Sequence, residues 1–351
     1  MEVSEKAADD LIRRLSKIPE PRKPRGIRHQ KISILAISIC AIMCNALNFS
    51  AIAQWAKGCS QNMLKRLWCR YNIRQRRYIA PSEPTIRRLL QRIDTEAVDS
   101  AIYGWLQSHF GDDIAVAVDG KTLKGAQRGG GKKVHLLTAF LHNTGTPIAQ
   151  REVEDTTNEI KTLRPLLEGI NLKGKVITVD AMHTQQETAR YLVEEKGADY
   201  LFTVKDNQKS LRKDIEDLKM VAFPPQHQTT EKGHGRIETR QIWSSSELNE
   251  YIDFPYVGQV FCVRREFEYV KSGKKTEEIA YGITSLSKEK ADPARLLQLN
   301  RGHWGIENSL NYVRDVTFNE DRSQIRTKNA PKVMSSLRNL VIGIFRILGK
   351  N

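Results

Sequence analysis

The chain has 351 residues, which is long enough for two or three domains and excludes a peptide or a single small module. Hydrophobic residues make up 40% and charged residues 28%, with 22 glycines and 12 prolines, and this composition excludes a disordered, collagen-like or low-complexity chain. The 56 Lys and Arg exceed the 41 Asp and Glu by a formal charge of +15, so we expect a polyanionic partner.

The cysteines and the apolar segments point to a protein of the cytoplasm. The five cysteines form no zinc-binding pattern, and an odd number argues against a disulfide framework, so we expect a reducing compartment. The apolar segment 32–44 has 13 residues, fewer than the roughly 20 that span a bilayer. It also lacks the position and cleavage pattern of a secretory signal. We therefore expect a buried helix there, no membrane contact, and association with the bacterial nucleoid when DNA is bound.

The first 110 residues hold 19 Lys and Arg but nine Asp and Glu, so they carry +10 of the total charge. Residues 1–24 contain three prolines and are interpreted as an arm. After the arm, apolar periodicity and capping residues predict helices over 32–47, 49–57, 61–71, 82–92 and 96–110. We expect an all-helical basic domain with a helix-turn-helix-like DNA contact through arginines that include Arg87 and Arg88. A solvated basic face is the alternative.

The pattern changes after residue 110. Apolar runs predict strands over 114–118, 135–141, 147–152, 175–179 and 200–204, with helices over 159–169, 184–195 and 208–221. Two hairpin strands followed by strands that alternate with helices indicate a mixed α/β sheet. We therefore divide the chain into a helical domain (1–110), the first part of a catalytic core (111–223), a β-rich insertion (224–290) and a helical final part of the core (291–351).

Two of the buried strands are each followed by an aspartate. Asp119 comes directly after the first apolar run and Asp180 directly after the fourth. Ligands of α/β folds collect at the carboxyl ends of parallel strands, so both carboxylates can converge on one cation if the two strands are parallel neighbours. The alternative is turn chemistry, because aspartate is common after strands.

A third carboxylate lies in a helical stretch expected over 293–316. Its apolar stripe should pack on the sheet and consists of Leu299, Ile306, Leu310 and Val313. The opposite face is expected to be polar and consists of Asn300, His303, Glu307, Asn311 and Arg314. Glu307 is the candidate third ligand, and a surface glutamate is the alternative.

Three carboxylates suit Mg²⁺, which prefers oxygen ligands and retains positions for water and phosphate oxygens. Two such ions can activate the attacking oxygen and stabilise the leaving oxygen in phosphoryl transfer on nucleic acid. Basic residues near these positions are candidates for holding the DNA backbone, and for each an ordinary surface role is the alternative. They are Lys121, Lys124, Lys205, His234, Arg236 and Arg314.

Several ordered motifs resemble those of the ISAs-type insertion-sequence DDE transposases, the group that includes the H-repeat-associated proteins. They are AVDGKTLKGA (117–126), TNEIKTLRPLL (157–167), VDAMHTQ (179–185), KDNQ (205–208), HGRIETR (234–240), RGHWGIENSL (301–310) and DVTFNED (315–321). The resemblance implies an RNase H-like core, interrupted by a β-rich insertion, in which Asp119, Asp180 and Glu307 are the catalytic and metal-binding residues.

The resemblance also implies roles for residues near these three. Asn158, Glu159, Trp304 and Asn308 are expected to be supporting residues, and His303 is expected to contact DNA together with the basic residues named above. The implied cofactor is Mg²⁺, with Mn²⁺ as a substitute.

The leading hypothesis is a transposase that cleaves DNA at transposon ends to free a 3′-hydroxyl and joins that hydroxyl to target DNA. Its partner is double-stranded DNA, both terminal repeats and target, and joining two ends implies a homodimer on DNA. Two alternatives remain. One is a related nuclease with the same core but without strand transfer, and the other is a domesticated DNA-binding protein without catalysis.

Overall fold

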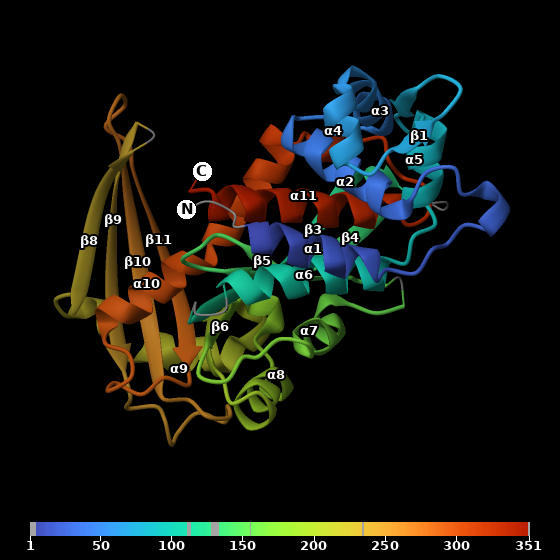
Figure 1. The fold of residues 1–351 in the computed structure, drawn as a ribbon. Helices are drawn as coiled ribbons and strands as arrows, with labels where there is room; N and C mark the ends of the chain where they lie inside the picture. Colours follow the sequence, from blue (N-terminus) through green and yellow to red (C-terminus); the bar gives the residue numbers. More distant parts are fainter. Residues whose placement is uncertain (1–4, 111–113, 128–132, 155, 234, 350–351) are drawn as a thin grey trace. The chain divides into compact units, whose positions relative to one another are not determined.

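The computed structural model describes residues 5–110, 114–127, 133–154, 156–233 and 235–349. The chain forms two compact units (Figure 1). Unit 1 comprises Met1–Asp112, Gly120–Asn158 and Glu307–Asn351, and unit 2 comprises Asp113–Asp119 and Glu159–Ile306. Each unit is thus assembled from segments that are distant along the sequence.

Unit 1 is built mainly from helices. Its elements are α1 (Glu5–Ser16), α2 (Lys31–Met43), α3 (Phe49–Gly58), α4 (Gln61–Arg66), β1 (Arg70–Asn72), β2 (Arg77–Ile79), α5 (Glu83–Leu90), α6 (Thr95–Phe110), β4 (Lys133–Leu141), β5 (Pro147–Glu152) and α11 (Ala330–Ile347). The C-terminal helix α11 packs against α2, α5, α6 and β5, which bury it over most of its length.

Two expectations for the N-terminal region were wrong. Residues 5–16 do not belong to an arm, because α1 is an amphipathic helix that buries Leu11 and Leu15, spaced one turn apart. The domain is also not all-helical, because the helix expected over 61–71 ends at Arg66 and an antiparallel hairpin of β1 and β2 follows. Tyr71 and Tyr78 face each other across the hairpin with ring centroids 5.1 Å apart, a cross-strand pair that stabilises strands.

The apolar segment of unit 1 is a buried helix, as expected. Ile34, Leu35 and Ile37 of α2 have no exposed surface, because α3 and α11 pack against this helix. Within the described ranges, no helix combines the length and the apolar character needed to cross a bilayer.

Unit 2 is an α/β arrangement. Its strands are β6 (Val176–Val179), β7 (Asp199–Val204), β8 (His227–Gly233), β9 (Arg236–Ser245), β10 (Gln259–Tyr269) and β11 (Lys275–Thr284). Its main helices are α7 (Glu159–Leu167), α8 (Gln186–Arg190), α9 (Lys209–Asp217) and α10 (Pro293–His303). Strand β3 (Ala115–Gln127) begins in unit 2, and its residues from Gly120 onward belong to unit 1.

The sheet is mixed, as the sequence predicted. In unit 1 the strand order is β5-β4-β3, and in unit 2 it is β3-β6-β7-β11-β10-β9-β8. Strand β6 runs parallel to β3 and to β7, whereas β11 is antiparallel to β7 and leads into the antiparallel insertion. Strand β8 was not predicted, because its sequence HQTTEKG is a mostly exposed, polar edge strand without an apolar alternation.

Helix α10 covers one face of the sheet of unit 2. Its residues Leu296, Leu297 and Leu299 share a core cluster with residues that include Leu201 and Phe261 of the strands. The helix expected to continue to residue 316 ends at His303, and two π-helical turns follow, η6 (Ile306–Asn311) and η7 (Val313–Thr317). Such irregular turns shift the face that side chains present, and they are frequent at functional sites.

Gly125 of β3 provides a test of packing within unit 1. A Cβ atom at this position would lie 2.0 Å from the carbonyl oxygen of Ser323. Since a backbone atom cannot move aside as a flexible side chain does, we expect Gly125→Ala to lower the free energy of unfolding by about 1–3 kcal/mol. The measurement is urea denaturation followed by circular dichroism. Gly58→Ala is the matched control, because nothing lies within 4 Å of its Cβ position, and equal stability of both variants would contradict the prediction.

Candidate active site

Asp119 and Asp180 lie side by side in unit 2. Val118 of β3 and Val179 of β6 are direct partners in a parallel pair, and each aspartate is the next residue in its chain segment. Adjacent strands are about 4.8 Å apart. The expectation that the two strands are parallel neighbours is therefore confirmed, and both half-buried carboxylates lie at the same edge of the sheet.

Asp180 is an ionised carboxylate next to a cation. The Nζ atom of Lys205 lies 3.1 Å from its Oδ1 atom. Burial by itself would raise the pKa of Asp180, but the backbone N–H of Ala181 and the ammonium group of Lys205 bring the pKa below its usual value. Because about half of each side chain is exposed, this ion pair adds little stability and can be displaced by another cation.

The turn after Asp180 is held by a set of polar side chains. The amide of Asn207 donates to the carbonyl oxygen of Ala181 at 2.7 Å, and the amide of Gln208 donates to the carbonyl oxygen of Thr184 at 2.8 Å. The hydroxyl of Thr184 donates in turn to the carbonyl oxygen of Thr203 in β7 at 2.6 Å. Sequence reasoning assigned no role to Asn207 or Gln208, although both lie in the KDNQ motif. They fix the backbone that carries Asp180.

Glu159 also supports this turn. Its Oε2 atom lies 3.3 Å from Nε2 of His183, whose side chain is buried and whose backbone N–H donates to the carbonyl oxygen of Asp180. Glu159 is thus a positioning residue that acts through His183, while the neighbouring Asn158 is exposed.

His303 does not contact DNA in the way that the sequence suggested. Its side chain is buried in unit 2 at the end of α10, where Nδ1 lies 3.2 Å from the hydroxyl of Thr178 in β6. Burial lowers the pKa of His303 to about 4, so the ring is neutral near pH 7 and offers no charge to a phosphate. Its neighbour Trp304 is 45% exposed and lies under the guanidinium of Arg265, at 5.4 Å from the ring centroid.

Glu307 belongs to unit 1. It is exposed on the π-helical turn η6, and Asn311 donates a hydrogen bond of 2.8 Å to its Oε2 atom. Asn308 beside it is exposed as well. Of the five side chains of the predicted polar face, Glu307 is exposed, whereas the other four are buried. The π-helical turns change the side-chain direction from that of a regular helix.

The expected DNA contact of Arg314 was also wrong. Its side chain has no exposed surface, and its guanidinium donates to Glu320 at 2.7 Å and to the hydroxyl of Ser335 at 2.7 Å. Arg338 of α11 donates to the other oxygen of Glu320 at 2.8 Å. Arg314 therefore belongs to a buried ionic network that holds the interior of unit 1 together.

Lys121 and Lys124 of β3 both pair with carboxylates of the DVTFNED motif. Lys121 lies 2.6 Å from Asp315, and its side chain is 10% exposed. Lys124 lies 2.6 Å from Asp321, but its side chain is 70% exposed. Lys121 thus joins two segments of unit 1, whereas Lys124 also faces solvent.

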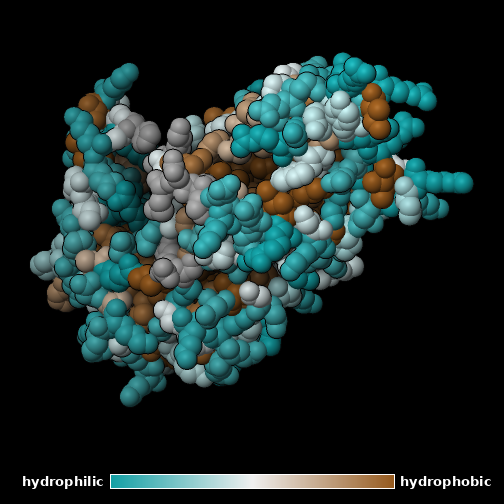
Figure 2. Space-filling view, in the orientation of Figure 1, coloured by the Kyte–Doolittle hydropathy of each residue, from teal (hydrophilic) through white to brown (hydrophobic). Residues whose placement is uncertain are grey.

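The remaining basic candidates lie at the surface, except that His234 falls outside the described residues. Arg236 begins β9 and stacks over the ring of Phe267 at 4.9 Å. Arg87 and Arg88 are exposed on α5, and Arg87 lies 3.3 Å from Glu83. Figure 2 shows that the visible surface over α3 and α4 is largely hydrophilic.

No group of three or more His, Cys, Asp or Glu side chains is gathered as a metal site within the residues that have a described position. The pair of Asp119 and Asp180 nevertheless has the donor chemistry that hard divalent cations prefer, because both are carboxylates and Asp180 already attracts the ammonium of Lys205. The residues present thus fit a divalent metal ion.

Comparisons with known proteins identify the family of the chain. Residues 110–344 match the family model described as "Transposase DDE domain", and residues 12–106 match the model described as "DDE_Tnp_1-associated". The putative transposase YncI of Escherichia coli O157:H7 is 31% identical over 350 residues, which cover 96% of this chain and 87% of that protein. The H repeat-associated putative transposase YhhI of Escherichia coli K12 is 31% identical over 358 residues, covering 95% and 89% of the two chains.

Among solved structures, the piggyBac transposase in a synaptic complex with hairpin DNA aligns with a TM-score of 0.44 and 12% identity, over 99% of this chain and 74% of the other. The family models together span most of the chain, and the relatives match over nearly their whole length. This chain is therefore a member of the transposase DDE domain family.

Proposed function

We propose that this protein is a metal-dependent transposase that cleaves DNA at the ends of an insertion sequence and joins the freed 3′-hydroxyl to target DNA. The observation that carries the proposal is the adjacency of Asp119 and Asp180, which each directly follow the last residue of the parallel pairing between β3 and β6, in a chain of the transposase DDE family. Glu307 is proposed as the third carboxylate on the basis of the motif that surrounds it.

The three carboxylates are proposed to hold divalent ions, with Mg²⁺ as the natural cofactor and Mn²⁺ as a substitute. When bound, such ions supply activation of the attacking oxygen and stabilisation of the leaving oxygen. Asp180 is suited to this role because its lowered pKa keeps it ionised near neutral pH, so a cation can bind without proton loss. Asn207 and Gln208 support it because they keep the backbone of its turn in place.

The substrate is proposed to be double-stranded DNA, first the terminal repeats and then the target. The N-terminal 110 residues carry +10 of the net charge and would hold the terminal repeats, with Arg87 and Arg88 among the contacts. Lys124, Lys205 and Arg236 are proposed to contact phosphates as well. Because two transposon ends are joined to one target, at least two copies of the chain would act together on DNA.

A cleavage and joining assay tests the function. The full chain is incubated with Mg²⁺, a duplex that carries the terminal repeat found beside its gene, and a supercoiled target. We expect nicks at the repeat boundary and products in which the repeat is joined to the target, and we expect both to disappear with EDTA. Nicks without joined products would support a nuclease instead. Tight, salt-dependent binding without any cleavage would support a non-catalytic DNA-binding protein.

A further inference from the structure

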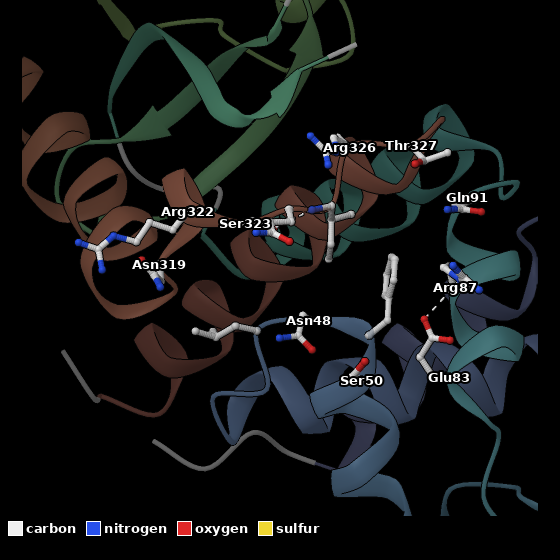
Figure 3. A pocket seen from close by; sticks show the side chains of 14 residues that line it. Asn48, Ser50, Glu83, Arg87, Gln91, Asn319, Arg322, Ser323, Arg326 and Thr327 are labelled. Atoms are coloured by element: carbon white, nitrogen blue, oxygen red, sulfur yellow. Dashed lines mark hydrogen bonds and ion pairs between the residues drawn. The ribbon is translucent and has the colours of Figure 1, made fainter. Parts of the chain in front are cut away.

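Unit 1 contains two adjoining cavities that no proposed catalytic residue lines. The first has a volume of about 620 Å³ and opens between the start of α3, the exposed side of α5 and the segment 319–327 (Figure 3). The second has a volume of about 950 Å³. The two cavities share Gln91, Arg326 and Thr327, so together they form one groove along the surface of unit 1. We call this the unit 1 groove.

The unit 1 groove is strongly basic. Five cationic side chains line it: Arg87 and Arg322 in the first cavity, Arg92 and Lys328 in the second, and Arg326 in both. Glu83 provides the single carboxylate among all lining residues of both cavities, and it is paired with Arg87 at 3.3 Å. Over the described ranges of the chain, no carboxylate lies within ion-pair distance of Arg322 or Arg326.

The guanidinium groups of Arg322 and Arg326 are exposed and lack a carboxylate partner among the described residues, so they add no ion pair to the fold. A bound polyanion would supply such a partner, since Arg matches the geometry of phosphate with two parallel N–H donors. The groove also presents side-chain amides, including Gln91, Asn319 and Gln324. Arg, Asn and Gln are the side chains that read base edges, whereas a site for a small inorganic anion needs neither this length nor these amides.

We propose that the unit 1 groove binds a strand of the terminal-repeat DNA, with backbone phosphates at Arg322 and Arg326. This inference rests on the proposed function and names the surface that holds its substrate. The binding groups come from both ends of the chain, because α3 and α5 belong to the N-terminal region and the two arginines follow Glu307 by 15 and 19 positions. DNA bound here would contact the same C-terminal segment that carries the proposed catalytic glutamate.

The test compares full-length variants in a binding assay that needs no catalysis. Affinity for a fluorescent terminal-repeat duplex is measured by anisotropy over a series of salt concentrations. The double variant Arg322→Ala/Arg326→Ala is expected to bind more weakly at every salt concentration. The slope of log affinity against log salt concentration is also expected to become shallower by about 1.8, which is about 0.9 for each lost phosphate contact. Arg322→Lys/Arg326→Lys retains both charges and is expected to keep the wild-type slope.

Arg13→Ala/Lys17→Ala is the matched control, because it removes two exposed charges of unit 1 that line neither cavity. Its slope is expected to equal that of the wild type. Thermal melting shows whether each variant is folded. A folded Arg322→Ala/Arg326→Ala variant with the wild-type slope would overturn the proposal, as would tighter binding of an RNA duplex of the same length.

The same preparations separate this inference from the proposed function. If the wild type nicks the terminal repeat while the groove variant binds like the wild type, the groove assignment fails and the function stands. If the groove variant loses binding but the wild type never cleaves DNA with Mg²⁺, the groove assignment stands and the catalytic function fails.

Discussion

Glu320→Gln is expected to lower the free energy of unfolding by roughly 3–5 kcal/mol, since it removes the carboxylate that lies between the buried guanidinium groups of Arg314 and Arg338. Glu320, Arg314 and Arg338 are each 2% exposed or less. Burial alone would raise the pKa of Glu320, but the two arginines hold it below its usual value. Without the negative charge, two cations remain in the interior of unit 1, where water cannot solvate them. Urea denaturation at pH 7 measures the change.

The same network predicts a pH dependence. The pKa of Glu320 is lower in the folded chain than in the unfolded chain. The ionised carboxylate therefore stabilises the fold above the ordinary pKa of 4.5, and this stabilisation is lost as the pH falls below that value. Glu195→Gln is the matched control, because Glu195 pairs with Arg164 at the surface, where ion pairs contribute about 0–1 kcal/mol. Similar stability losses for the two variants would show that the buried network does not hold unit 1 together.

Asp119→Asn and Asp180→Asn are each expected to reduce DNA cleavage by about a thousandfold or more. Under the proposed function, replacing one carboxylate removes a charged metal ligand that is worth several kcal/mol of transition-state stabilisation, and each 1.36 kcal/mol is a factor of ten in rate. Asparagine has nearly the same shape as aspartate, so the fold and the affinity for DNA should be retained. Single-turnover nicking of a terminal-repeat duplex with Mg²⁺ measures the effect.

Asp206→Asn provides the matched control for these variants. Asp206 follows the neighbouring strand β7, but its side chain is 81% exposed and pairs with Arg212 instead of facing the aspartate pair. Its cleavage rate is expected to stay within about twofold of the wild type, because an exposed ion pair contributes little. If Asp119→Asn and Asp206→Asn cleave DNA equally well, the catalytic assignment of the aspartate pair is wrong.

The sequence predicted most elements of the mixed sheet because their signals are local. The apolar runs before Asp119 and Asp180 form buried strands. The segment after residue 223, which is rich in β-branched residues, forms the antiparallel insertion. The hairpin after Arg66 was missed because its basic and aromatic residues also suit a helix surface. Edge strand β8 was missed because its exposed, polar residues carry no periodic pattern.

The sequence by itself determined that Asp119 and Asp180 each follow a buried apolar run, whereas their adjacency came from the parallel pairing of the two strands in the structure. It also determined the family, through ordered motifs. Only the tertiary structure decided which basic residues are exposed. Arg314 lies inside a charge network and His303 is a buried neutral ring, whereas Arg322 and Arg326 line an open groove. The charge of a side chain follows from its residue type alone. Its burial depends on segments that are distant in the sequence, so a local sequence pattern cannot predict it.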